Sequence, residues 1–371
     1  MSEYQYYEWQ TIDRPLTARE QMDVNGLSSH MDTVTSTQAI VTYSWGDFKH
    51  DPMQVLLKYF DAFLYDSNFG LRELMFRLPK NLTAVDLFRP YLIEDRIMLE
   101  KRGTYFVLHI EVNDEANYFD WVESEGTLGQ FAPLRDQLLQ GDMRILYLAW
   151  LKAISIDDIE EWEGESEPPV PAGLRQLNSS LQAFAEFFEI APHLISAAAE
   201  ASKKVEANTE GDFESAISKL TREEADAYLL KISRGDPGAA LSLRKRLAES
   251  SCEKPSGQTQ STRAVGELFE RAKKIEREAK RKARQEAERK RIQRLEKLAQ
   301  EEEANWNSVE RLLEQKRGST YDEATKLLVE LRDMSEYKQK RNTFTERLRG
   351  IQDKYGKSAA LMERFRRAGL K

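Results

Sequence analysis

The chain has 371 residues, of which 40% are hydrophobic and 32% charged, with a formal net charge of −8, one cysteine and four histidines. A single cysteine excludes a disulfide framework and a cysteine-based structural zinc site. The absence of an apolar run of about 18 residues excludes a transmembrane helix, and the acidic, aromatic start is unlike a signal peptide. We therefore expect a soluble, cytoplasmic protein of two or three domains.

The charge is divided unevenly along the chain. Residues 263–371 hold 30 Lys and Arg against 20 Asp and Glu, which leaves 25 against 43 for residues 1–262. Because a globular domain averages about 25% charged residues, the excess charge predicts an elongated helical tail.

Residues 1–156 alternate between strand-like and helix-like segments. Thr17 and Glu20 form a capping box, and Asp51 before Pro52 is an N-cap, so each predicts a helix start. Apolar residues from Val55 to Leu64 then recur at helical spacing. The predicted strands are 4–12, 37–45, 71–78 and a hairpin over 96–112, and the predicted helices that follow are 127–139 and 142–155. Such local segments predict an α+β domain.

An all-α middle domain is predicted after this. Residues 157–172 are acidic and proline-rich, which is typical of a solvated linker. Residues 173–250 contain no convincing strand, and Thr221 with Glu224 forms another capping box, so this range predicts a helical domain. Residues 251–262, which include Cys252, form a second predicted linker.

The remaining residues, 263–371, predict one long charged helix over 264–316 and a C-terminal helical hairpin or small bundle. Several glutamates precede a basic residue by four, as in Glu286 and Lys290, which favours ion pairs along a helix. The shorter helices are predicted over 321–336, 341–354 and 357–368. The apolar seam of the long helix is uneven, which predicts a thin antiparallel contact or a solvated single helix rather than a strong coiled coil. The large residues of the seam are candidates for partner binding: Ile292, Leu295, Trp306 and Leu313.

A polar and aromatic loop over 43–51 joins a predicted strand to the helix that Asp51 begins. Its candidate binding residues are Trp45, Asp47, Lys49 and His50, beside a helix start whose free amides can hold an anion. The alternative is a tight turn at Gly46 with a packed Trp45. Arg72, Arg77 and Lys80 near the next strand add positive charge there or form its solvent face.

A basic tract in the long helix offers candidate phosphate contacts. The alternative is a solvated or partner-facing helix, because glutamates are interleaved and aromatic residues for base stacking are missing. The candidate residues are Lys280, Arg281, Lys282, Arg289, Lys290 and Arg291.

No familiar catalytic, nucleotide-binding or zinc-binding motif occurs in the sequence. The four histidines are isolated, and His109 inside a predicted strand is interpreted as structural. We therefore predict no cofactor and no metal site, with a metal site built from scattered His, Asp and Glu side chains as the alternative. An enzyme of unknown class with a site near residues 45–51 stays as one alternative.

The chain resembles a family of uncharacterised bacterial proteins across nearly its whole length. The resemblance lies in Tyr4 to Glu8, Asp13 to Thr17, Trp45-Gly46-Asp47 and Tyr59 to Ala62. In the tail it lies in Trp306, Val309-Glu310, Lys316-Arg317, Tyr321 to Ala324 and Ala368 to Leu370. The family has no established activity, so no catalytic residue is carried over. The genes of its members look like neighbours of genes that encode SWIM-type zinc-finger proteins. The resemblance therefore implies a SWIM-type zinc-finger protein as a partner.

Together these observations predict an interaction or adaptor protein of a bacterial cytoplasmic complex. It would bind its partner through the long C-terminal helix and the hairpin that follows. A nucleic-acid-associated protein that contacts phosphates through residues 273–297 is the second alternative.

Overall fold

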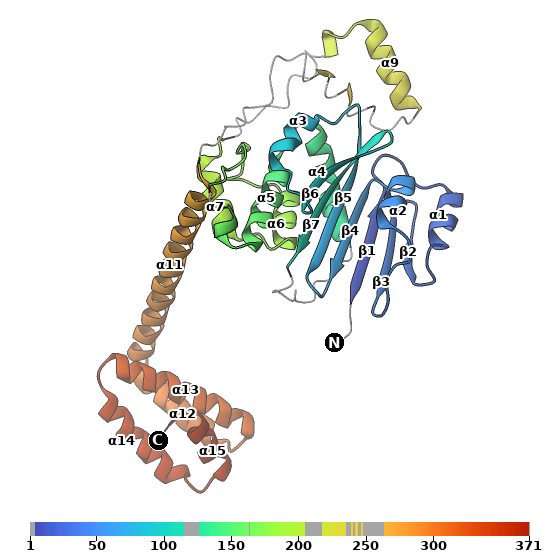
Figure 1. The fold of residues 1–371 in the computed structure, drawn as a ribbon. Coiled ribbons are helices and arrows are strands. Elements are labelled where there is room, and N and C mark those ends of the chain that lie inside the picture. The colour runs from blue at the N-terminus through green and yellow to red at the C-terminus, as the bar shows by residue number, and fades with distance from the viewer. Residues whose placement is uncertain are drawn as a thin grey trace. The chain divides into compact units, whose positions relative to one another are not determined.

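The computed structural model describes residues 4–114, 126–162, 164–204, 217–234 and 263–370, with 239, 242, 243, 246 and 247. The chain divides into two compact units, 1–276 and 277–371. An N-terminal antiparallel sheet is followed by many helices, including a long C-terminal helical stretch (Figure 1). This confirms the predicted order of α+β and then helical structure. No helix of the described residues is long and apolar enough to cross a membrane.

The first unit is built on a seven-stranded sheet in the order β2-β3-β1-β4-β5-β7-β6. All neighbouring strands are antiparallel, and the N-terminal strand β1 lies between β3 and β4. The strands are β1 (Gln5–Gln10), β2 (Met31–Val34), β3 (Gln38–Tyr43), β4 (Ala62–Ser67), β5 (Leu71–Pro79), β6 (Ile97–Arg102) and β7 (Tyr105–Asn113).

The helices of this unit begin largely where the capping residues predict. The Thr17 side chain accepts a hydrogen bond from the Glu20 N–H, and Asp51 accepts one from the Met53 N–H. The second helix ends at Tyr59, however, so the predicted helical stripe through Leu64 is wrong. The elements are α1 (Ala18–Asn25), α2 (Pro52–Tyr59), α3 (Val85–Phe88), η1 (Arg89–Tyr91), α4 (Thr127–Leu139), α5 (Arg144–Ile156), η2 (Ile159–Trp162), α6 (Ser179–Phe187), α7 (Pro192–Ala201) and α9 (Arg222–Ser233).

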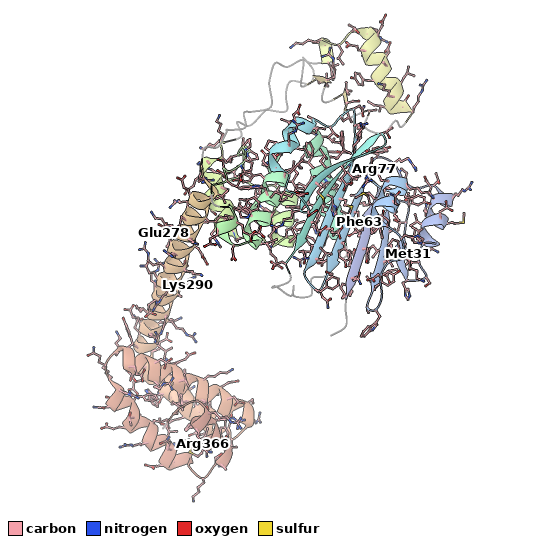
Figure 2. All side chains as sticks on the ribbon, in the orientation of Figure 1. Met31, Phe63, Arg77, Glu278, Lys290 and Arg366 are labelled. Atoms are coloured by element: carbon pink, nitrogen blue, oxygen red, sulfur yellow. The ribbon has the colours of Figure 1, made fainter. Side chains whose placement is uncertain are left out.

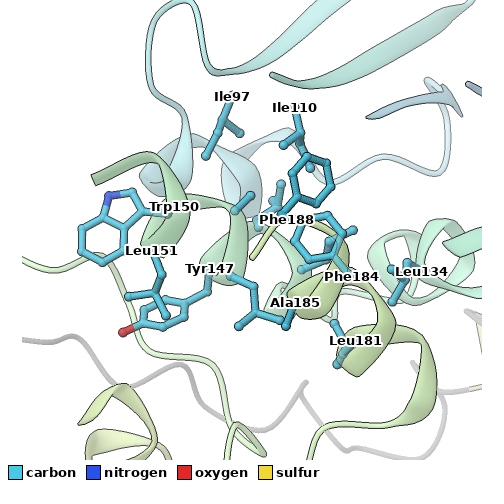
Figure 3. Close-up of a cluster of buried hydrophobic side chains, with 14 of the residues drawn as sticks. Ile97, Ile110, Leu134, Tyr147, Trp150, Leu151, Leu181, Phe184, Ala185 and Phe188 are labelled. Carbon is cyan, nitrogen blue, oxygen red and sulfur yellow. The ribbon is translucent and has the colours of Figure 1, made fainter. Parts of the chain in front are cut away.

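Alternate residues of each strand enter two different cores, because successive side chains point to opposite faces of a sheet. One face, with Leu74 and Ile110, packs against α4, α5 and α6, where Tyr147, Phe184 and Phe188 are buried (Figure 3). The other face, with Trp9 and Phe63, packs against α1 and α2. The sheet is therefore covered by helices on both sides over part of its width.

The predicted domain boundaries at 157–172 and 263 are corrected by this packing. Val170 and Leu174 belong to the same core as the sheet, and so do α6 and α7, so the range 157–172 separates no independent domain from the first. Glu167 is buried and accepts two hydrogen bonds from Arg263. The first apolar residues of the long helix, Val265 and Leu268, enter this core as well. The predicted linker 251–262 lies outside the described residues.

The second unit is a set of helices around a core of its own. Helix α11 (Val265–Gln300) starts in the first unit and continues into the second, where it is followed by α12 (Glu302–Glu314), α13 (Gly318–Tyr337), α14 (Arg341–Tyr355) and α15 (Ala359–Arg367). The predicted helix over 264–316 is thus two helices. Leu328, Leu331 and Leu361 are fully buried in the core of this unit.

Candidate functional site

The loop between β3 and α2 holds the four predicted binding residues on the surface. Trp45 is 77% exposed, so the alternative of a packed Trp45 is wrong, whereas the turn at Gly46 has a φ of 79° that favours glycine. Asp47, Lys49 and His50 are exposed as well. The His50 ring packs against the buried Phe48, with 5.6 Å between the ring centroids.

Of the four candidate binding residues, only Asp47 forms a side-chain hydrogen bond to the sheet within the described part of the chain. The Gln5 side-chain amide donates to Asp47 Oδ1 at 2.8 Å, and Gln5 Oε1 accepts from the hydroxyls of Tyr7 at 2.6 Å and Tyr65 at 3.0 Å. In the part of the chain that the structure describes, no hydrogen bond or ion pair joins Asp47 to Lys49 or His50. The loop residues therefore do not converge on one point, and the loop gives no support to an enzyme active site.

Burial sets the protonation state of the two tyrosines beneath the loop. It raises the pKa of Tyr7 to about 12 and raises that of Tyr65 as well, and Asp47 and Glu73 add to the shift at Tyr7. Both hydroxyls are therefore protonated at neutral pH and donate hydrogen bonds to Gln5. Their hydrogen bonds hold the Gln5 side-chain amide in place.

A group of metal-ligating side chains that the sequence did not predict lies on the same face of the sheet. Glu73 of β5 is directly opposite Glu111 of β7, and His109 lies two residues before Glu111. His109 Nε2 is 3.0 Å from Glu73 Oε2 and 3.8 Å from Glu111 Oε2. One ligand atom from each of the three residues lies within 4.8 Å of the other two.

The charges in this group oppose one another. Burial raises the pKa of Glu111, the negative charge of Glu73 raises it further, and His109 lowers it. The side chains are 10% exposed for His109, 19% for Glu73 and 33% for Glu111. The interpretation of His109 as an isolated structural histidine is therefore incomplete, because it contacts two carboxylates.

The apolar seam that was predicted to bind a partner is largely buried within the chain instead. Leu295, Trp306 and Leu313 are buried in the core of the second unit, where α13, α14 and α15 of the same chain cover them. Ile292 is half-buried. The physical reason is that the apolar residues of the C-terminal helices satisfy this seam within the chain, so it is not available to a partner.

The basic tract of α11 is the largest exposed charged feature among the predicted sites. All side chains of residues 279–291 are exposed, including those of Ala283 and Ala287. Figure 2 shows side chains projecting from this helix, among them the labelled Lys290. The ion pairs along the helix surface include Lys290 with Glu286 at 2.9 Å and Arg291 with Glu288 at 3.5 Å. This stretch is thus a helix in contact with solvent on every face, which is compatible with both predictions for the tract, phosphate contacts and a solvated or partner-facing helix.

Two arginines that the sequence offers as surface charge are held by acidic partners instead, Arg72 fully buried and Arg77 half-buried. Arg72 is 1% exposed, donates to Asp66 at 2.8 Å and stacks on the Phe187 ring. Arg77 donates to Asp61 at 2.6 Å. Both arginines stabilise the body of the first unit and are not part of an anion site at the loop.

Comparison of the chain with family models, curated proteins and solved structures finds no match. The resemblance to a bacterial family therefore stays a prediction. The candidate surfaces are distinguished by their geometry and charge alone.

Proposed function

We propose that this chain is an interaction protein that binds a polyanionic partner through the exposed basic stretch of α11, residues 280–291. The observation that carries the proposal is the exposure of this stretch on every face of the helix. A helix without a covered face has no apolar surface to bury, so its contacts with a partner are made by its charges.

The charge of this stretch favours nucleic acid as the partner. Residues 280–291 contain seven basic and two acidic residues. Lysine and arginine that neutralise phosphates release counterions, which gives affinity without base recognition. The lack of aromatic residues in the stretch is consistent with contacts to the backbone rather than to stacked bases.

The burial of the apolar seam argues against the alternative of a partner helix packed along Leu295 and Leu313. The proposal includes a protein partner only as a further component of the complex that this chain forms with nucleic acid. The family resemblance makes a SWIM zinc-finger protein the first one to test in a co-purification.

Reversing three charges in this stretch should weaken nucleic-acid binding strongly. We expect the Lys280→Glu, Arg281→Glu, Lys282→Glu variant of the full chain to bind a 20-base-pair duplex at least about tenfold more weakly, and the slope of log affinity against log salt to shrink by about 3. Fluorescence anisotropy between 50 and 200 mM salt measures both quantities.

A matched variant controls for net charge. Lys338→Glu, Lys340→Glu, Lys357→Glu makes the same change in charge at exposed positions of the same unit. This variant should bind the duplex with an affinity within about twofold of that of the unchanged chain, because the basic residues of 280–291 that contact phosphates are still present. Equal loss in both variants, or an affinity that is independent of salt, contradicts the proposal.

A further inference from the structure

A His and two Glu side chains meet on one face of the sheet, and nothing in the described residues neutralises the two carboxylates except the histidine. Glu73 and Glu111 occupy directly opposite positions on β5 and β7. Like charges in such positions destabilise a sheet. Among the described residues, no Lys or Arg forms an ion pair with either glutamate, and His109 is the basic group that contacts both.

We propose that Glu73, His109 and Glu111 bind one divalent first-row transition metal ion. The sheet register holds His109 and Glu111 on one strand and Glu73 directly across from Glu111, so the donor set is formed by the fold itself. An ion placed between these atoms would neutralise both carboxylates and relieve their repulsion. The proposal is independent of the basic stretch in α11.

The geometry suits such an ion with little adjustment. Metal–ligand distances of about 2.0–2.2 Å to nitrogen and oxygen require ligand atoms roughly 3–4 Å apart. The distances of 3.0 Å and 3.8 Å from His109 Nε2 to the two carboxylates lie in this range. The partly exposed Glu111 side chain can supply the remaining movement.

The donor set also indicates the class of ion. One imidazole nitrogen with two carboxylate oxygens suits Mn²⁺, Fe²⁺, Co²⁺ or Zn²⁺ better than Mg²⁺ or Ca²⁺, which prefer oxygen alone. Three protein ligands leave at least one coordination position open for water or an anionic ligand. The exposure of Glu111, at 33%, gives this position access to solvent.

Metal binding to the full chain tests the proposal directly. Chelator-treated protein is titrated with Co²⁺ alone, followed by the visible absorption of the ion, and with Zn²⁺ alone by calorimetry. We expect one ion per chain, a rise in the melting temperature with Zn²⁺, and at least tenfold weaker binding by Glu73→Gln and by Glu111→Gln. The control is Glu100→Gln on β6, whose carboxylate pairs with Arg102 on the same face of the sheet.

The outcomes separate cleanly. Loss of binding in the Glu73 and Glu111 variants with retention in the Glu100 variant supports the site. Absence of stoichiometric binding by the unchanged chain at 1 mM metal overturns it and leaves a histidine bridging two glutamates. Unchanged affinity in folded Glu111→Gln also overturns it, and this variant decides alone if Glu73→Gln does not fold, because Glu111 is the most exposed of the three.

Discussion

Replacing Asp61 with asparagine is expected to lower the free energy of unfolding of the first unit by about 3–5 kcal/mol, the usual cost of removing one partner from a buried ion pair. The Asp61 carboxylate is 1% exposed and accepts hydrogen bonds from Arg77 at 2.6 Å and from the backbone N–H groups of Ile12 and Asp13. The buried Arg135 also contacts it at 3.8 Å. Asparagine offers one acceptor oxygen where this site uses two.

The effect should depend on pH with a definite sign. Burial by itself raises the pKa of Asp61, but the charges of Arg77 and Arg135 and the two backbone hydrogen bonds outweigh burial and hold the pKa below its usual value. The stability from Asp61 is therefore present above the unfolded pKa of about 3.9 and is lost as the pH falls through the folded pKa. Urea unfolding at pH 7, 5, 4 and 3 should show that the difference in free energy of unfolding between the unchanged chain and Asp61→Asn shrinks toward low pH.

A surface aspartate supplies the control for this prediction. Asp86 forms an ion pair with Arg89 at 3.4 Å, but its side chain is 90% exposed. Exposed pairs contribute about 0–1 kcal/mol, so Asp86→Asn should change the stability by no more than that. Equal stability losses for Asp61→Asn and Asp86→Asn would refute the role given to the buried cluster.

Local signals were enough to predict many elements of this fold. The capping boxes at Thr17 and Thr221 and the hairpin predicted over 96–112 depend on residues close to one another in the sequence. The helical stripe predicted through Phe63 is wrong because a short apolar run fits both a helix and a buried strand. Phe63 is in a strand because it pairs with Trp9, more than fifty residues away in the sequence. The spacing of apolar residues within one segment cannot reveal such a distant partner.

The cluster of Glu73, His109 and Glu111 escaped prediction for the same physical reason. His109 and Glu111 are visibly alternate residues of one predicted strand, but Glu73 comes from a strand that the sequence does not place beside it. The order β5-β7-β6, with β7 paired on both edges, brings the three together. Once that register is known, two carboxylates and a histidine on one face are the signal to look for.

The charge pattern was informative about exposure but not about packing. It predicted a basic helical tract over 273–297, and the side chains of residues 279–291 within this tract are exposed. It did not distinguish an apolar seam that binds a partner from one that packs against the chain's own helices, since both have the same spacing. A substitution of Leu313 distinguishes the two interpretations. A core residue should lower the stability of the free protein when it is truncated, whereas a surface seam residue should not.

Leu313→Ala should lower the free energy of unfolding of the second unit by about 2–5 kcal/mol, as expected for a large-to-small substitution in a core. Leu313 is fully buried in the cluster that contains Val309, Leu328 and Leu361. Hydrogen-exchange mass spectrometry of the full chain should show lost protection across α12 to α15. The sheet of the first unit should keep its protection, because its cores contain no residue of this cluster.

Leu230→Ala is the matched control, since the same side chain is removed from a position that is 53% exposed in α9. It should change stability by less than about 0.5 kcal/mol. A surface seam residue would behave like Leu230 in the free protein and lose only partner binding, whereas a core residue destabilises the free protein itself. Similar small effects for both substitutions would restore the partner-seam interpretation and contradict the packing of this unit.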